Sequence, residues 1–340
     1  MIQFHVFFDL PNPYNPAVLT EFEIIRHYFC QASPTAELGV GDDAAIIALP
    51  LGKELVVSTD TLVSGQHFFA DADPLKLGHK SLAVNLSDMA AMGATPRWAM
   101  LAITLPKQLI KENNQWISEF SKGFYKLAQE YQVALIGGDT TSGPLNICVQ
   151  IMGEVNQGQA LLRSNARPNE DIWISGCLGD AALVLAHQQQ RIKLQSVEVE
   201  QCLPALLTPT PRIELGQQLI NYANSAIDIS DGLLADLGHI LDCSDVGAII
   251  NIDAIACSGV LQNYLPHPDV INCLLAGGDD YELCFTTSII NRLEIERLSS
   301  ELSIPLTRIG KTTAIKGLKV LDSDGSELTQ ENKGYEHFYT

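Results

Sequence analysis

The hydrophobic positions of this chain follow two spacings, one typical of strands and one typical of helices. Short apolar runs predict strands at residues 98–105, 132–136, 146–154 and 171–175. Apolar positions three and four apart predict helices at residues 20–30, 73–93 and 108–131, then from Asp180 and through Leu237 and Ile240. Thr20 and Glu23 form a capping box at the start of the first helix. This alternation predicts an α+β fold made of α/β layers.

Residues 41–60 combine the strand spacing with acidic groups. Apolar runs at 46–49 and 55–57 flank chain-breaking residues, so we expect a hairpin. Its ends carry three carboxylates and two hydroxyls, from Asp42, Asp43, Ser58, Thr59 and Asp60. Clustered carboxylates are unfavourable unless a cation neutralises them, and hard oxygen ligands suit Mg²⁺ or Ca²⁺. Asp42 and Asp43 fit an ordinary turn equally well.

The chain of 340 residues is longer than a single hydrophobic core usually supports, so we expect two domains. A turn-rich stretch near residues 155–170 suggests the junction. The expected parts are an extension at 1–18, an N-terminal domain at 19–160 and a C-terminal domain at 161–340. Three prolines in the extension predict irregular structure there.

Charge and composition limit the partners. The net charge of −19 argues against a role on nucleic acid or on an anionic membrane surface. No apolar stretch is long enough to cross a bilayer, and the apolar start lacks the basic residues of a signal peptide. The eight cysteines form no Cys-x-x-Cys pair, and most have the apolar neighbours of buried thiols in a reducing compartment. We therefore expect a cytoplasmic protein without a zinc ribbon.

Short acidic motifs rich in glycine and hydroxyl residues recur in both halves. They stand at residues 85–88, 137–141, 228–232 and 277–280. The motif at 85–88 weakly resembles the one at 228–231, and residues 137–139 weakly resemble residues 277–279. Mg²⁺ usually takes one or two carboxylates together with substrate phosphates, so such motifs suit a polyphosphate ligand. Asp88 alone also fits the solvated face of an amphipathic helix. A Walker A motif is absent, because Pro305 stands where the first glycine before Gly310-Lys311-Thr312 would be.

Taken in order, these motifs resemble the thiamine-monophosphate kinase family of the aminoimidazole ribonucleotide synthetase-like superfamily. The resemblance runs from about Leu19 to Phe338 and rests on residues 41–45, 58–68, 85–93, 137–141, 227–233 and 277–283. It implies phosphorylation of thiamine monophosphate to thiamine diphosphate by direct in-line transfer of the ATP γ-phosphate, with several Mg²⁺ ions, in thiamine diphosphate biosynthesis. It also implies the two-domain fold of this superfamily, with ATP and Mg²⁺ bound by the N-terminal domain at 19–160 and the site completed by the C-terminal domain at 161–340. A homodimer whose N-terminal sheets pair into a barrel is implied as well.

The resemblance further implies roles for individual residues. The Mg²⁺ ligands would be Asp43, Ser58, Thr59, Asp60, Asp88, Asp139, Asp228 and Asp231. The ATP contacts would be Gly138, Asp139, Arg163 and Ser230. The substrate contacts would be His67, Asp279 and Tyr335, although the family commonly has glutamate at the position of Asp279. A catalytic base is not expected, because the acceptor phosphate is already ionised at neutral pH.

Single residues also have plainer interpretations. Arg163 fits a surface position at the domain junction, His67 a structural loop histidine, and Tyr335 packing at the C-terminus. Lys80 is able to approach a phosphate, but a solvated helix lysine is the simpler interpretation.

Two other functions stay open. One is another ATP-dependent synthetase or dehydratase of the same superfamily, although the tail lacks the cysteine expected of hydrogenase maturation relatives. The other is a non-catalytic divalent-metal-binding protein, although the chain has no EF-hand spacing.

Overall fold

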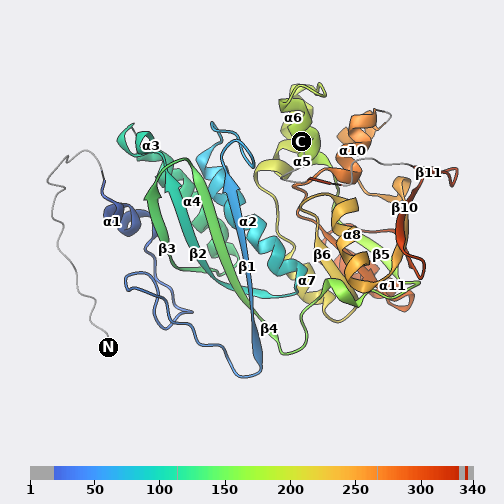
Figure 1. Cartoon of the computed structure of the whole chain (residues 1–340), viewed down its shortest axis with the longest axis horizontal. Helices are drawn as coiled ribbons and strands as arrows, with labels where there is room; N and C mark the ends of the chain where they lie inside the picture. Colours follow the sequence, from blue (N-terminus) through green and yellow to red (C-terminus); the bar gives the residue numbers. More distant parts are fainter. Residues whose placement is uncertain (1–18, 113, 266, 329–333, 336–340) are drawn as a thin grey trace.

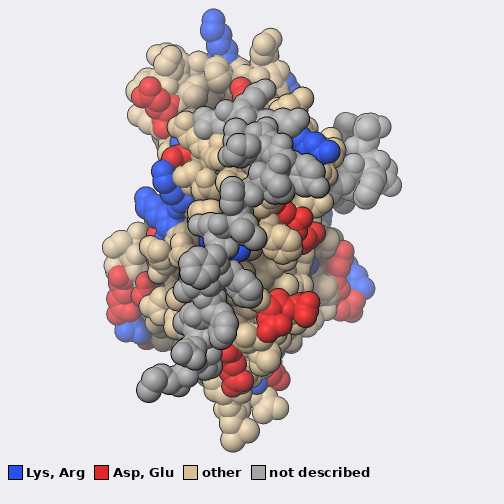
Figure 2. All heavy atoms as spheres, turned by 90° about the vertical axis from the view of Figure 1, so that its left-hand side faces the viewer, with Lys and Arg blue, Asp and Glu red and all other residues tan. Residues whose placement is uncertain are grey.

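The computed structural model describes residues 19–112, 114–265, 267–328 and 334–335, so the extension predicted at residues 1–18 lies outside the described residues. The fold has two sheets side by side, each covered by helices (Figure 1). No helix among the described residues has the length and apolar character needed to cross a membrane. On the face shown in Figure 2, acidic and basic side chains are interspersed.

The first sheet has four long strands in the order β1-β4-β2-β3. Their bounds are β1 Lys53–Val63, β2 Thr95–Leu105, β3 Ala134–Ser142 and β4 Asn146–Asn156. β1 pairs with β4 over its whole length, from Lys53 opposite Asn156 to Val63 opposite Asn146. One face packs on the helices α2 Pro74–Ala91 and α4 Gln115–Glu130, whereas residues around Ala45 and Ile47 touch the other face. The first face therefore carries the larger core.

Helix α2 is held by close packing on two sides. Asp73 accepts a hydrogen bond from the N–H of Leu75 at 2.9 Å and begins the helix. A Cβ atom on Gly78 would lie 2.0 Å from the carbonyl oxygen of Phe120 in α4. A Cβ atom on Gly216, in α7 Ile213–Leu219, would lie 2.0 Å from the carbonyl oxygen of Ala90. Because only glycine permits these approaches, α2 sits firmly between the first sheet and the second half.

The second sheet has seven strands in the order β11-β10-β7-β9-β5-β8-β6. They are β5 Asp171–Ser175, β6 Ala223–Asp228, β7 Gly247–Asn251, β8 Leu283–Thr287, β9 Leu306–Thr313, β10 Gly317–Leu321 and β11 Glu327–Leu328. The longer helices of this half are α5 Asp180–Gln188, α6 Ser196–Leu207, α8 Leu233–Ser244, α10 Pro268–Ala276 and α11 Arg292–Leu302. The shorter elements of the chain are α1 Glu21–Ile24, α3 Lys107–Glu112, α9 Gly259–Tyr264 and the single turns at 25–29, 163–165, 252–254 and 289–291.

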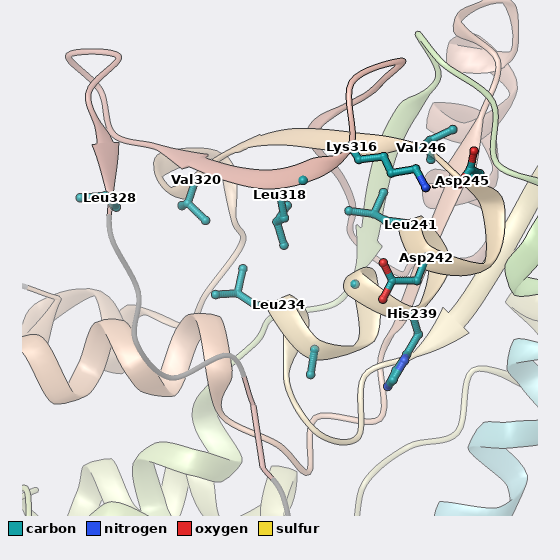
Figure 3. Close-up of a pocket in the computed structure, with 13 residues that line it drawn as sticks. Leu234, His239, Leu241, Asp242, Asp245, Val246, Lys316, Leu318, Val320 and Leu328 are labelled. Atoms are coloured by element: carbon teal, nitrogen blue, oxygen red, sulfur yellow. Dashed lines mark ion pairs between the residues drawn. The ribbon is translucent and has the colours of Figure 1, made fainter.

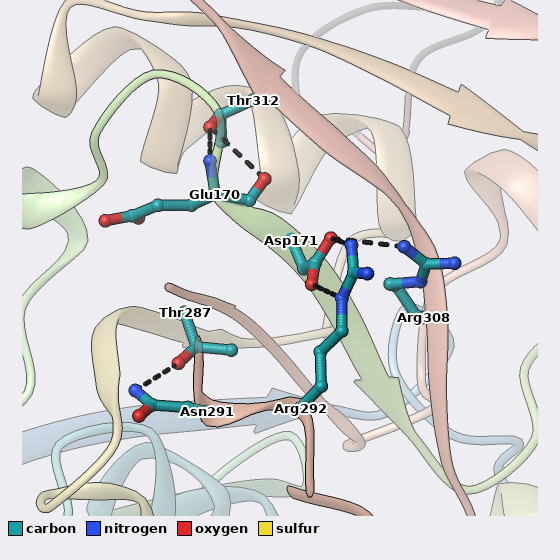
Figure 4. Close-up of polar contacts among 7 residues, drawn as sticks. All are labelled: Glu170, Asp171, Thr287, Asn291, Arg292, Arg308 and Thr312. Atoms are coloured by element: carbon teal, nitrogen blue, oxygen red, sulfur yellow. Dashed lines mark hydrogen bonds and ion pairs between the residues drawn. The ribbon is translucent and has the colours of Figure 1, made fainter. Parts of the chain in front are cut away.

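The start of β5 is fixed by charged groups (Figure 4). The buried Asp171 carboxylate accepts hydrogen bonds from Arg292 Nε, at 2.5 Å, and Nη2, at 2.8 Å, and lies 3.4 Å from Arg308 Nη1. Burial opposes the charge of Asp171, but the two guanidinium groups hold its pKa below the usual value. Next to it, the carbonyl oxygen of Glu170 accepts a hydrogen bond from the N–H of Thr312 in β9, and the N–H of Glu170 donates one to the Thr312 hydroxyl. These contacts join α11 and β9 to the middle of the sheet.

Most of the predicted elements are confirmed, including the capping box at Thr20 and the helix that begins after Asp73. The predicted hairpin at residues 41–60 is wrong, because residues 41–49 make only isolated bridges, such as Leu38 with Ile46. β1 instead finds a full-length partner in β4, and the alternating apolar residues before it pack on the face of the sheet. The apolar pattern indicated burial correctly but not the surface that provides it.

Three further expectations need correction. Residues 108–131 form two helices, α3 and α4, with Asn114 at the cap position of the second, since asparagine favours helix ends over interiors. The strand predicted at 132–136 continues through the glycines to Ser142 as β3. Of the eight cysteines, only Cys202, Cys273 and Cys284 are buried, so most are not core residues.

Candidate active site

The first part of the site lies where β1 crosses α2. Ser58 and Asp60 point toward α2, because residues of β1 alternate between this side and the exposed outer face. The Ser58 hydroxyl donates a hydrogen bond to Asp88 Oδ2 at 2.5 Å. Burial, followed by the charges of Asp88 and Asp231, raises the pKa of Asp60 to about 7. Burial also raises the pKa of Asp88, although Ser58 and the charge of Arg163 oppose this rise.

The second part comes from the end of β6. Asp228 is the last residue of that strand and is buried. Burial and then the charge of Asp88 raise its pKa to about 8, while the neighbouring Ser87 hydroxyl opposes the rise. Carboxylates from β1, α2 and β6 thus lie close enough to disfavour one another's charge. Asp88 is half-buried within this cluster, so it is not a residue of a solvated helix face.

The loop between β6 and α8 is shaped by a residue that the sequence analysis missed. Asp236 Oδ2 accepts hydrogen bonds from the backbone N–H groups of Ser230, Asp231 and Gly232 at 3.0–3.1 Å. Burial raises the pKa of Asp236 to about 7, and these N–H groups oppose the rise. A carboxylate in the first turn of a helix after a glycine was the available sequence signal. Asp236 therefore fixes the loop that presents Ser230 and Asp231.

The loop before β8 runs along the same segment. Asp279 and Tyr281 donate backbone hydrogen bonds to the carbonyl oxygens of Ser230 and Ile229, at 2.9 and 2.8 Å. Both have positive φ angles, 70° and 50°, which non-glycine residues rarely adopt. Asp279 Oδ2 lies 3.1 Å from Lys80 Nζ of α2. Lys80 is only 4% exposed, so the solvated interpretation of this lysine is wrong.

The remaining predicted residues divide into two groups. Tyr335 is brought to the site by its backbone, because its N–H donates to the carbonyl oxygen of Asp231 at 2.9 Å, whereas its side chain is 48% exposed. Arg163 is exposed but close enough to affect the pKa of Asp88. His67 lies in the turn after β1, where Nδ1 accepts a hydrogen bond from the N–H of Val63 at 3.0 Å.

The other group lies away from this cluster in the single chain. Asp43 is exposed in a turn, and its N–H bonds the side chain of Asp42 at 2.9 Å. Thr59 faces the outer side of the sheet, opposite to Ser58 and Asp60. Gly138 and Asp139 lie on β3, which is at the other edge of the sheet from β1, with β4 and β2 between them.

A pocket of about 380 Å³ lies in the second half, between α8 and β10 (Figure 3). Leucine and valine side chains from both elements line it, and Lys316 pairs with Asp245 at one end. None of the predicted site residues lines this pocket. The acidic cluster is therefore the better candidate for chemistry.

The donor chemistry of the cluster suits a hard divalent cation, since it consists of carboxylate and hydroxyl oxygens. Among the described residues, no three acidic, histidine or cysteine side chains are placed so that they could hold a metal ion together. Mg²⁺ usually keeps several waters and takes substrate phosphates as ligands alongside one or two carboxylates. A divalent cation held by these oxygens would be able to neutralise a polyphosphate placed between the two halves.

Comparison with known proteins places the chain in a family. Residues 41–155 match the family described as AIR synthase related protein, N-terminal domain. The thiamine-monophosphate kinase of Escherichia coli (strain K12) is 44% identical over 325 residues, which cover 94% of this chain and 98% of that protein. The thiamine-monophosphate kinase of Bacillus subtilis (strain 168) is 32% identical over 313 residues, 89% of this chain and 94% of that protein.

Solved structures agree with this placement. The crystal structure of thiamine-monophosphate kinase from Stenotrophomonas maltophilia K279a has a TM-score of 0.79 at 45% identity, covering 87% of this chain and 93% of that one. The structure of AaThiL complexed with AMPPCP and TMP has a TM-score of 0.73 at 29% identity, covering 86% and 89%. Escherichia coli HypE, a hydrogenase maturation protein, shares the fold at 19% identity, with a TM-score of 0.72 and coverage of 92% and 96%. By sequence and by structure, this chain belongs to the thiamine-monophosphate kinase family.

Proposed function

We propose that this protein transfers the γ-phosphate of ATP to thiamine monophosphate and so forms thiamine diphosphate and ADP. Relatives covering 94% of the chain carry this activity in their name, and AaThiL, which has the same fold, is complexed with AMPPCP and TMP. The observation that carries the proposal is that Asp60 and Asp88 of the first half and Asp228 of the second lie close enough to affect one another's pKa, with Ser58 bonded to Asp88. Such a cluster suits a reaction whose main difficulty is bringing two phosphorylated molecules together.

In this proposal Ser58, Asp60, Asp88, Asp228 and Asp231 hold Mg²⁺ in the presence of substrates. The ions would supply positive charge that offsets the repulsion between the phosphates and the carboxylates. The chain's own contribution is to fix the carboxylates on rigid elements, namely β1, α2 and the end of β6. A proton acceptor is not required, because the attacking phosphate oxygen of thiamine monophosphate is already ionised.

The organic parts of the substrates are assigned to the rim of this cluster. We propose that Arg163 and Ser230 contact ATP, with Arg163 close enough to influence Asp88. Asp279 and Tyr335 would contact thiamine monophosphate, because both are bonded to the loop that carries Ser230 and Asp231. His67, in the turn beyond the end of β1, would bind the same substrate. The carboxylate of Asp279 and the ring of Tyr335 suit a cationic thiazolium.

The positions of Thr59 and Asp139 support a homodimer. By register, Asp139 pairs with Ala102, Ala102 with Cys148, and Cys148 with Thr61, so Asp139 and Thr59 share the outer face of the sheet. Three strand spacings of about 4.8 Å separate their strands by roughly 14 Å, too far for one metal ion. If two sheets close into a barrel, the β3 edge of one subunit meets the β1 edge of the other. We propose that the partner thereby brings Gly138 and Asp139 to Thr59, the neighbour of Asp60 on β1.

A mixed dimer tests this arrangement. Subunits carrying Asp60→Asn and Asp139→Asn are co-expressed with different tags, and the mixed dimer is purified through both. If the two carboxylates of one site come from different subunits, one site of the pair carries both substitutions and the other carries none. About half of the wild-type activity is then expected. A mixed dimer as inactive as its parents contradicts the shared site.

We propose a domain boundary near residue 160, between β4 and β5, with Asp43 becoming part of the metal site only when substrates bind. We also propose that the protein acts in the cytoplasm.

The activity is tested by incubating the purified protein with ATP and Mg²⁺ and separating the products by chromatography. Thiamine monophosphate and free thiamine are offered in parallel. Thiamine diphosphate formed only from the monophosphate supports the proposal, because the site then requires a phosphate acceptor. ATP binding without this product contradicts it and points to another ATP-dependent member of the superfamily.

A further inference from the structure

The buried lysine on α2 has a position that a purely structural role does not explain. Lys80 is 4% exposed, and its ammonium lies 3.1 Å from the carboxylate of Asp279. Removing a lysine from water costs several kcal/mol, and a buried ion pair often stabilises a fold no better than apolar residues of similar volume. An apolar residue would therefore serve the packing of α2 as well. We therefore look for the role of the Lys80 charge in the candidate active site rather than in packing.

Both oxygens of Asp279 are held by side chains from different directions. Oδ2 faces Lys80, and Oδ1 accepts a hydrogen bond from the hydroxyl of the buried Tyr281 at 2.8 Å. The backbone supports the same placement, because the N–H groups of Asp279 and Tyr281 bond the carbonyl oxygens of Ser230 and Ile229. The carboxylate is thus fixed by groups from α2 and from its own loop, while its side chain stays 28% exposed.

The loop adopts an unfavourable backbone to achieve this. Asp279 and Tyr281 have φ angles of 70° and 50°, and non-glycine residues in this region carry strain that other contacts must offset. Between them, the Asp280 side chain turns the other way and accepts the N–H of Gly179 at 2.9 and 3.1 Å. A Cβ on Gly278 would lie 2.3 Å from the carbonyl oxygen of Ser230, so the loop also presses closely on the site segment. The contacts that Lys80 and Tyr281 make with the Asp279 carboxylate offset the strain of this backbone conformation.

Lys80 also lies at a distinct end of the site. It precedes Asp88 by eight residues on α2, a rise of about 12 Å at 1.5 Å per residue. The Lys80 ammonium is paired with Asp279, whereas Ser58 and Arg163 are the groups that act on Asp88. This pairing assigns Lys80 to the part of the site that Asp279 forms rather than to the phosphates held at Asp88. It favours a role at the end that receives the organic part of the substrate.

We propose that Lys80 is a positioning residue for thiamine monophosphate: together with Tyr281 it fixes the Asp279 carboxylate where the substrate's organic end binds. This inference rests on the proposed function. Because Lys80 belongs to α2 and Asp279 to the second half, the ion pair also requires the two halves to be correctly joined before the substrate binds.

Steady-state kinetics of Lys80→Met, Asp279→Asn and the double variant test this role. Lys80→Met keeps the length of the side chain and removes the charge. We expect the KM for thiamine monophosphate to rise about tenfold, the effect of losing one modest hydrogen bond to a charged group. The KM for ATP should change less than twofold, and Lys80→Arg should restore part of the loss. Lys76→Met, at a half-buried lysine one turn earlier, is the matched control and should behave as wild type.

The double variant separates positioning from direct contact. If Lys80 acts through Asp279, adding Lys80→Met to Asp279→Asn changes the KM for thiamine monophosphate by less than twofold. If the two effects multiply, Lys80 touches the substrate itself and the inference is wrong. Equal rises in both KM values, together with a lower urea midpoint, would show a structural role and also overturn it. A wild-type protein that forms no thiamine diphosphate refutes the proposed function instead, and is recognised before any variant is compared.

Discussion

Replacing Gly78 by alanine provides a sharp test of how α2 is held in place. The new Cβ would lie 2.0 Å from the Phe120 carbonyl oxygen, and ordinary contact begins at 3.4 Å. The two atoms must therefore move apart by about 1.4 Å, and both belong to backbone that cannot rotate away. Overpacking of this kind costs about 1–3 kcal/mol or more, against a gain of about 1 kcal/mol from alanine's helix propensity. Because the neighbouring atoms belong to backbone, the cost lies at the upper end of this range, and we expect a net loss of about 2 kcal/mol.

Gly238 in α8 supplies the matched control, because a Cβ there meets no atom within 4 Å. Gly238→Ala should stabilise the protein by about 0.5–1 kcal/mol, since only the propensity term remains. Urea unfolding followed by circular dichroism measures both variants, and the midpoints should move in opposite directions. Because α2 carries Lys80 and Asp88, Gly78→Ala should also lower turnover, whereas Gly238→Ala should not. Equal midpoints for the two variants would refute the close packing of α2 on α4.

Three further predictions concern single side chains. Asp60→Asn should reduce turnover at least about 100-fold with little change in the urea midpoint, because it removes a charge from the cluster but almost no volume; near-normal turnover would rule out the metal role. His67→Ala should raise the KM for thiamine monophosphate more than that for ATP, and an equal effect on both would contradict the placement of the substrate. Asp171→Asn should cost about 2 kcal/mol at pH 7, measured by urea unfolding, because it removes the charged partner of Arg292 and Arg308. The folded-state pKa of Asp171 is lowered, so its stabilisation is present above the unfolded pKa of about 4 and lost as pH falls further. The difference between the two proteins should therefore shrink in acid, and a difference independent of pH would contradict this reasoning.

Local patterns in the sequence predicted local structure well. The cap at Asp73, the box at Thr20 and the strand that ends at Ser175 all depend on residues within a few positions of one another. The hairpin at residues 41–60 failed because apolar alternation reports burial but not the partner that provides it. Strand pairing over about 90 residues, as between β1 and β4, leaves no local signal in one sequence.

For the site as well, motifs within the sequence were informative, whereas contacts between distant parts of the chain could not be predicted. Motif order was sufficient to single out Asp60, Asp88 and Asp228, whose mutual approach the pKa shifts reflect. It could not place Lys80 beside Asp279, because this contact depends on how α2 packs against the second half, 199 residues away along the chain. Asp236 was missed for a different reason, since its function is to bond backbone N–H groups rather than a ligand.

The central claim is that phosphoryl transfer occurs at the carboxylate cluster between the two halves. The most direct test is to follow the label from γ-³²P-ATP, with Mg²⁺ and thiamine monophosphate, in the wild type and in Asp228→Asn. In the wild type, label should pass into thiamine diphosphate as an equal amount of ADP forms. The variant should lose at least about 100-fold of this transfer while its urea midpoint stays unchanged or rises, because Asp228 is a buried carboxyl whose burial disfavours its charge. Label transfer at the wild-type rate in Asp228→Asn would contradict the account.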